Sequence, residues 1–258
     1  MKKKIIMAIM LVLSAALLVA ASVLGTLAFL ASSTAVSNTF TVGEVGIQMF
    51  ESKLNPDGTD ADGAAKTSDG NSYLLIPGKT YKKDPTIYVN AKSVPSYLFV
   101  KIKNGIETIE AGYAKSDEGV VTYGANSMRA QMIAKGWQLV KHNKETGEEL
   151  YLYVGFNDAE KTQTKATASM PTDPKALVYT AVGSQTEEQQ YDVFETFTVD
   201  VNAAVRDYAG AKVTLTAFAI QTESFANDQV GGLAGYQKAW NAIVGRFPFE
   251  SGTVFSAN

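Results

Sequence analysis

A loop rich in aspartate and glycine carries the first residues whose spacing could do chemistry. Asp60, Asp62 and Asp69 partly match the oxygen ligands of a calcium loop of the D-x-[DN]-x-[DN]-G type. The match is incomplete, because the first ligand position falls on Gly58 and the last holds aspartate where glutamate is usual. Aspartate and glycine also occur together because both favour turns. We expect a solvated loop, with calcium binding as the alternative.

The side chains that hydrolases use are scarce in this chain. It has one histidine, His142, and no cysteine, so a thiolate zinc site or a cysteine nucleophile cannot form. Lysine and asparagine flank His142, and no serine or carboxylate pattern points to it. The pairs Glu148-Glu149 and Glu187-Glu188 are sequence neighbours, which on a strand face opposite sides. We therefore expect no enzyme, no catalytic residue and no cofactor, and no metal apart from the calcium alternative.

Aromatic residues offer a different chemistry, which is stacking on carbohydrate. The chain holds Trp137, Trp240 and 12 tyrosines. Most of the aromatic residues fall at alternating strand positions or on the apolar stripe of a helix, where rings usually pack in a core. We expect packing, with a sugar-binding surface as the alternative.

The first residues predict export. Lys2–Lys4 precede an uncharged and largely apolar run over Ile5–Ala31, and small residues follow it. This order is typical of a secretory signal peptide. We expect a signal over 1–28, with cleavage as late as residue 35, and a mature N-terminus within Phe29–Val36. The alternative is a retained membrane anchor, because the run is long enough to span a bilayer as a helix.

Charge and cysteine content bear on the compartment. The formal net charge is −3, and the basic residues of the first segment leave the rest of the chain more acidic. A binder of nucleic acid needs a basic face to neutralise phosphate, so we expect no nucleic-acid partner. An exported chain without cysteine indicates a bacterial exterior, more naturally that of a Gram-positive cell.

Short alternating runs predict the strands that must position these residues. In one of them, Leu98, Val100 and Ile102 share a face, and Lys144–Gly147 is a plausible hairpin turn between two others. The last run has apolar residues on both faces, which is typical of a central strand. The predicted strands cover Thr86–Asn90, Tyr97–Lys103, Gly136–Lys141, Leu150–Val154, Leu177–Ala181, Tyr191–Val201 and Lys212–Gln221.

Two segments have helical spacing. Asn126 or Ser127 could cap a short helix that ends at Gly136. A second helix ends at Gly245 and places on one side Leu233, Tyr236, Trp240, Ile243 and Val244. Many short strands with few helices predict a mainly β protein, namely a jelly-roll-like antiparallel β-sandwich with two short helices, preceded by an N-terminal signal helix. We expect one domain over 29–258, with a polar insertion at about 158–174.

The first strand of this domain is expected over 38–50. Phe40 and Val42 alternate with polar residues, and Val45 and Ile47 alternate with the opposite parity. Because a side-chain period of two cannot change phase without an inserted residue, we expect a bulge near Gly43.

The same segment carries a resemblance. Asn38–Val45, placed directly after a long signal, resembles the TasA/camelysin-like group of secreted proteins, which are processed by a SipW-type signal peptidase. Further segments similar to that group are Leu75–Thr80 with Lys83–Pro85, Val94–Ile102, Gly136-Trp137, Tyr151–Tyr153, Ala217–Phe225 and Ala239-Trp240. The resemblance implies a jelly-roll-like β domain, secretion, and assembly into biofilm-matrix fibres. Some members carry a metallopeptidase label, which the residues of this chain do not support, and the chain lacks an LPxTG-type ending for sortase.

The leading hypothesis is a secreted, non-enzymatic structural protein of an extracellular fibre or surface layer. Its strand over 38–50 would fill a gap in the sheet of a neighbouring copy, with Phe40, Val42, Val45 and Ile47 in pockets. The expected partners are the chain itself, the SipW-type signal peptidase and an accessory matrix protein, with membrane contact only through the uncleaved signal. The alternative to strand donation is that this strand pairs within its own sheet. A secreted adhesin or carbohydrate-binding surface protein, and then a camelysin-like peptidase, are the alternatives.

Overall fold

The computed structural model describes residues 31–35, 38–39, 45–61, 65–157, 163–227 and 232–250, with side chains from Val45 onward. Antiparallel strands form most of its regular structure, and two α-helices lie beside them in this part of the chain. The prediction of a mainly β, antiparallel sandwich with two short helices is confirmed. Among the described helices, none has both the length and the apolarity to cross a membrane.

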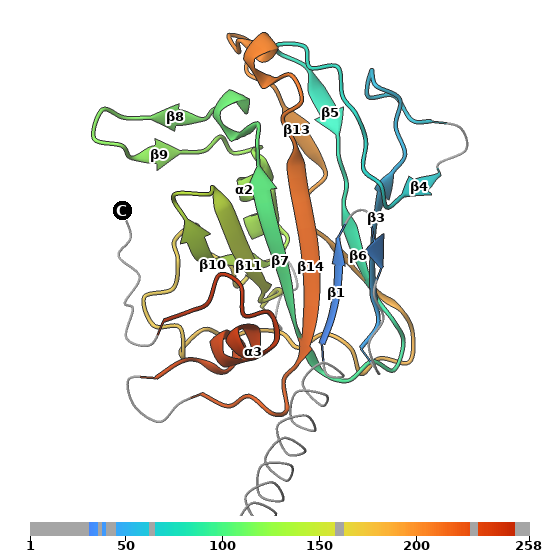
Figure 1. Cartoon of the computed structure of the whole chain (residues 1–258), viewed down its shortest axis with the longest axis vertical. Helices are drawn as coiled ribbons and strands as arrows, with labels where there is room; N and C mark the ends of the chain where they lie inside the picture. Colours follow the sequence, from blue (N-terminus) through green and yellow to red (C-terminus); the bar gives the residue numbers. More distant parts are fainter. Residues whose placement is uncertain are drawn as a thin grey trace, which may run out of the picture.

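The largest sheet has six strands in the order β10-β11-β7-β14-β1-β2 (Figure 1). Its longest strands, β7 and β14, pair along their whole length, from Val213 opposite Asn104 to Gln221 opposite Ser96. The bounds are β1 (Ala31–Ala35), β2 (Asn38–Thr39), β7 (Ser96–Asn104), β10 (Trp137–Asn143), β11 (Glu148–Tyr153) and β14 (Val213–Gln221).

The remaining strands form smaller sheets. A four-stranded sheet has the order β12-β6-β3-β4, and β13-β5 and β8-β9 are two-stranded pairs. Figure 1 shows β3 and β6 side by side along one flank of the large sheet, β5 beside β13 above them, and the β8-β9 hairpin extending from the opposite side. The bounds are β3 (Ile47–Ser52), β4 (Lys66–Thr67), β5 (Thr80–Lys82), β6 (Thr86–Val89), β8 (Ala114–Lys115), β9 (Val121–Thr122), β12 (Gln189–Asp192) and β13 (Thr196–Thr198).

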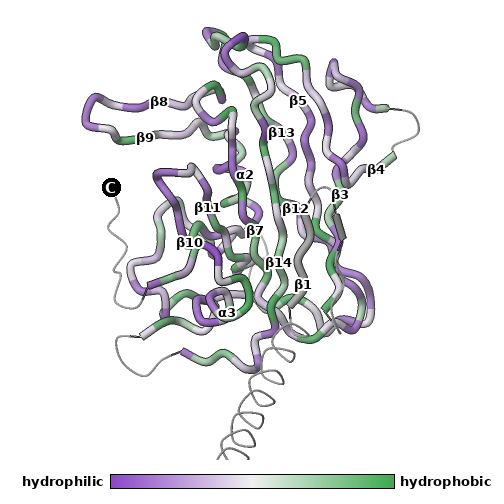
Figure 2. Tube along the Cα trace, in the orientation of Figure 1, coloured by the Kyte–Doolittle hydropathy of each residue, from purple (hydrophilic) through white to green (hydrophobic). Residues whose placement is uncertain are grey.

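The two faces of β7 belong to two apolar clusters. Leu98, Val100 and Ile102 belong to a core shared with β3, β6 and β14. Tyr97 and Phe99 point the other way, into a second cluster that the C-terminal helix covers. Figure 2 shows apolar residues gathering where β14 passes this helix, and hydrophilic residues along β8. Because both faces are covered, the central strands are apolar on both sides.

Two helices pack against strands of the large sheet. Helix α2 (Met128–Ala134) begins at Ser127, whose hydroxyl oxygen accepts a hydrogen bond from the backbone N–H of Ala130 at 3.2 Å. Helix α3 (Gly235–Ile243) buries Trp240 against the large sheet. The 3₁₀ turns η2 (Glu107–Ile109) and η3 (Val205–Tyr208) lie in the connections. The predicted helices, including the cap at Ser127, are confirmed.

Two strand predictions were wrong. The run Leu177–Ala181 is not a strand, and its Val178 is 63% exposed because no neighbouring strand is in place to pair with it. The run Tyr191–Val201 is divided into β12, which pairs with β6, and β13, which pairs with β5. Val193 and Phe194, which lie between them, are both buried, so the alternation ends where the chain crosses from one sheet to the next. In the polar stretch 158–174, the described residues 163–174 contain no strand.

Candidate functional site

The N-terminal strand β1 lies against the outer edge of β14. The pairing runs from Ala31 opposite Ile220 to Ala35 opposite Thr216, and β2 continues the sheet on the far side of β1. The remaining residues of β14, Val213–Leu215, pair with β7 and extend beyond the register of β1. This edge is therefore the place where the first described segment of the chain joins the sandwich.

The candidate assembly strand over 38–50 is not one strand. Phe40 and Val42, with the expected bulge near Gly43, lie outside the described residues. Val45 is 1% exposed and Ile47 is fully buried, and β3 pairs with β6 on one side and β4 on the other. Val45 and Ile47 therefore belong to the core of their own chain, in agreement with the alternative that this strand pairs within its own sheet. A hypothesis of strand donation therefore cannot rest on Val45 and Ile47.

Polar contacts hold β3 in place at its C-terminal end. The carboxylate of Glu51 pairs with the ammonium of Lys83 at 2.7 Å, and both side chains are buried. Asp84 accepts hydrogen bonds from the backbone N–H of Ser52 at 2.8 Å and from its hydroxyl at 2.6 Å. Removing either partner of this ion pair while the other stays buried would leave an uncompensated charge, which costs several kcal/mol. Strand β3 is thus a fixed part of the fold.

Two of the three candidate calcium ligands, Asp60 and Asp69, lie among the described residues. Asp60 forms an ion pair with Lys82 at 3.1 Å, Asp69 is exposed, and Asp62 lies outside the described residues. In the part of the chain that the structure describes, no group of three or more acidic, histidine or cysteine side chains is arranged to hold a metal ion. The arrangement fits a solvated loop.

The two glutamates of β11 face opposite sides, as the strand period predicts. Glu148 pairs with Lys101 at 2.9 Å, whereas Glu149 pairs with Arg129 at 3.0 Å. His142 lies opposite Glu149 on β10, and Glu187-Glu188 are exposed in a loop. The carboxylates of Glu148 and Glu149 therefore do not share a face.

Both tryptophans are fully buried. Trp137 donates a hydrogen bond from its indole N–H to the carbonyl of Asp192 at 2.8 Å. Trp240 donates to the carbonyls of Arg246 and Phe247. The expectation that these rings pack in the core is confirmed, so neither offers a face to a sugar.

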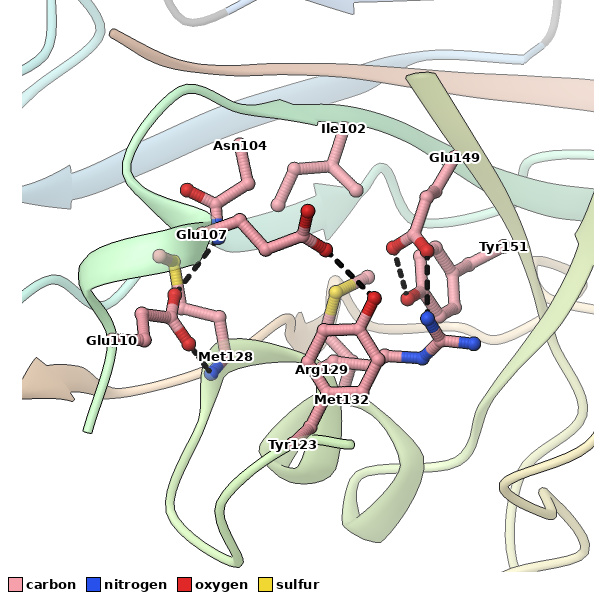
Figure 3. Close-up of a pocket in the computed structure, with 10 residues that line it drawn as sticks. All are labelled: Ile102, Asn104, Glu107, Glu110, Tyr123, Met128, Arg129, Met132, Glu149 and Tyr151. Atoms are coloured by element: carbon pink, nitrogen blue, oxygen red, sulfur yellow. Dashed lines mark hydrogen bonds and ion pairs between the residues drawn. The ribbon is translucent and has the colours of Figure 1, made fainter. Parts of the chain in front are cut away.

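A polar pocket between β7, β11 and α2 has no counterpart in the sequence patterns (Figure 3). It brings together three glutamates, one arginine and two tyrosines from segments that are far apart in the chain. No fixed spacing links these segments, so no sequence motif marks the pocket. Its lining residues are Ile102, Asn104, Glu107, Glu110, Tyr123, Met128, Arg129, Met132, Glu149 and Tyr151.

Each glutamate of the pocket has a partner inside the protein. Glu107 accepts a hydrogen bond from the Tyr123 hydroxyl at 2.8 Å, and Glu149 accepts one from the Tyr151 hydroxyl at 2.6 Å in addition to its pairing with Arg129. The Arg129 guanidinium also lies 4.5 Å from the centre of the Tyr123 ring. The pocket is therefore an internally satisfied network and does not present a free acid and base to a substrate.

Glu110 is a buried glutamate of this pocket whose pKa is raised. It is 4% exposed, and its carboxylate accepts hydrogen bonds from the Asn104 side-chain amide at 2.8 Å and the Met128 backbone N–H at 3.2 Å. Burial raises the pKa of Glu110 to about 7, and the nearby charges of Glu107 and Glu149 act in the same direction. The two hydrogen bonds lower the pKa and only partly offset the burial.

This pKa predicts a stability that depends on pH. The folded protein binds the Glu110 proton more tightly than the unfolded chain, whose ordinary pKa is 4.5. The contribution is therefore fully present below pH 4.5 and is lost as the pH rises towards 7. We expect Glu110→Gln to remove about 2–3 kcal/mol of the difference between the free energies of unfolding at acid and neutral pH. Denaturant unfolding at pH 4.5 and pH 8 measures it, and parallel pH profiles for both proteins would contradict it.

In comparisons with known proteins, no family model, curated protein or solved structure matches the chain.

Proposed function

We propose that this chain is a secreted, non-enzymatic structural subunit that copies of itself build into an extracellular fibre or surface layer, in the manner of the TasA/camelysin-like group it resembles. One observation carries the proposal. The first described strands, β1 and β2, form the outer edge of the large sheet beside β14, directly after the apolar N-terminal run of the chain. An edge strand at the end of a chain can be supplied by a neighbouring copy.

The proposed export step bears directly on β1. The window for the mature N-terminus, Phe29–Val36, encloses β1, which runs over Ala31–Ala35. Cleavage after Ala28 by a SipW-type peptidase leaves β1 at the free end of the mature chain. Cleavage after Ala35 removes it and leaves the backbone groups of β14 without that partner. The cleavage site thus decides whether the subunit carries a strand to donate.

The composition of β1 suits exchange better than that of β3. Its residues are Ala, Ser, Ser, Thr and Ala, which are all small. Exchange of such a strand between copies gives up little buried apolar area, and the backbone hydrogen bonds are the same in either chain. Strand β3, in contrast, carries Ile47 and Met49 into the core and is held by the Glu51–Lys83 pair. The donor segment therefore ends upstream of Val45.

A comparison of two mature forms tests this function. A chain that begins at Phe29 is expected to form assemblies that grow with time in electron micrographs. A chain that begins at Val36 lacks β1 and is expected to stay small, because its β14 edge has nothing to receive from a neighbour. Size distribution and melting temperature are measured together on both forms.

A peptide supplied in trans serves as the control. A synthetic peptide of residues 29–36 should bind the shorter form and raise its melting temperature, whereas the same peptide with proline in place of Ser33 should not. The proposal fails if the form that begins at Phe29 remains monomeric at high concentration. It also fails if the form that begins at Val36, which lacks β1, assembles equally well.

A further inference from the structure

A lysine, an asparagine and a glutamate meet beside β3, away from the assembly edge. The Lys83 ammonium lies 2.7 Å from Oε2 of Glu51. The side-chain amide of Asn71 donates to Oε1 of the same carboxylate at 3.0 Å. Glu51 is 2% exposed and Lys83 is 5% exposed. One buried carboxylate therefore holds an amine on one oxygen and a carboxamide on the other.

The carboxamide of Asn71 is also fixed by the backbone. Its oxygen accepts a hydrogen bond from the N–H of Leu54 at 2.7 Å, and its nitrogen donates to the carbonyl of Ser52 at 2.8 Å. The Leu54 N–H that donates to Oδ1 polarises the carbonyl. It would also stabilise the negative charge that develops on Oδ1 if a nucleophile added to Cγ. The two bonds from Nδ2 set the orientation of the amide.

We propose that Lys83 and Asn71 form an intramolecular isopeptide bond, with Glu51 as the group that transfers the protons. The amine, the acid–base group and the polarised carbonyl are the three parts that aminolysis of an amide requires. They lie within one hydrogen-bonded unit in which the amine and the carboxylate are buried and Asn71 is half-buried, so the amine is held close to the carbonyl by its contact with Glu51.

The reaction balances without any added reagent. Glu51 first takes a proton from the Lys83 ammonium, and the neutral Nζ then adds to Cγ of Asn71, with the oxyanion on Oδ1 held by the Leu54 N–H. Proton transfer through Glu51 to Nδ2 lets the Cγ–Nδ2 bond break, and ammonia leaves. The products are the Nζ–Cγ amide, a protonated Glu51 and one molecule of ammonia, which is a loss of about 17 Da.

The position of the proposed bond would let it resist mechanical extraction of β3. Asn71 follows β4, and Lys83 lies between β5 and β6, so the link closes a covalent loop over the end of β3. The chain has no cysteine, so disulfides cannot supply such a cross-link. The bond would make β3 harder to extract while leaving the β1 edge free, and its presence does not depend on whether the subunit assembles.

Mass spectrometry of the full mature chain tests the proposal. The intact wild-type protein is expected to be about 17 Da lighter than its sequence mass. Trypsin should release the peptides 67–79 and 83–92 as one branched species, because Lys83 is acylated. Fragmentation of that species should place the junction on Asn71 and Lys83. A succinimide at Asn71 gives the same mass loss but leaves the two peptides separate.

Three variants identify the roles of the groups. Lys83→Arg keeps the cation and Asn71→Ala removes the electrophile, and each should restore the full sequence mass. Glu51→Gln retains both reacting groups and should also restore it, or slow the reaction by at least about 100-fold during incubation. Circular dichroism confirms that each variant is folded. Separate peptides 67–79 and 84–92 from folded wild-type protein after prolonged incubation would overturn the proposal, because trypsin cleaves after Lys83 only when its amine is free.

Discussion

Trp240→Ala is expected to lower the free energy of unfolding by about 3–5 kcal/mol. The ring is fully buried, and its centre lies 5.2 Å from that of Phe99 and 5.0 Å from that of Phe218. Truncation removes this apolar contact area and leaves the carbonyls of Arg246 and Phe247 without their indole donor. Helix α3 would lose its main anchor on the large sheet.

Denaturant unfolding measures this loss, and Trp240→Phe is the matched control. Phenylalanine keeps most of the buried area and loses the N–H donor, so we expect a smaller loss of about 1–2 kcal/mol. Phe218 lies on β14 opposite Ser33 of β1, so Trp240 packs beside the strand with which β1 pairs. A loss below about 1 kcal/mol for Trp240→Ala would show that α3 is not anchored through this ring.

The elements that could be predicted from sequence are those whose apolar period matches their packing. Strands β7 and β14, the β10–β11 hairpin and both helices follow this rule. The Lys144–Gly147 turn also does, with Gly147 at φ 68° accommodating a conformation that other residues rarely adopt. The predicted strand over Leu177–Ala181 fails because alternation shows which residues could line a face, and it does not show whether a partner strand is present.

The candidate sites were harder to predict for a related reason. The pattern over 38–50 correctly marked Val45 and Ile47 as inward-facing, and it could not show that the core they face is that of their own chain. The polar pocket and the Lys83–Glu51–Asn71 unit each join segments that are separated by turns of irregular length. Such groups are set by tertiary pairing, in which a carboxylate is buried only because its partner arrives from another strand.

The second large loss of unfolding free energy is expected on replacing Arg129 in the polar pocket. Arg129 and Glu149 are 19% and 10% exposed in their side chains and lie 3.0 Å apart. Arg129→Met keeps much of the apolar stem and removes the charge, so Glu149 stays buried beside Tyr151 without a cation. We expect a loss of about 3–5 kcal/mol in the free energy of unfolding, because an uncompensated charge remains in a site of low dielectric constant.

The ion pair of Lys101 with Glu148, the neighbour of Glu149 on β11, provides the control. Lys101 and Glu148 are 28% and 27% exposed in their side chains, so water can replace the lost partner. Lys101→Met should therefore cost no more than about 1 kcal/mol. The double variant Arg129→Met with Glu149→Gln should recover part of the loss, because no charge is then left unpaired. Equal losses for Arg129→Met and Lys101→Met would mean that Glu149 is as well solvated as Glu148, and that the pocket contributes no more to stability than an ion pair on the surface.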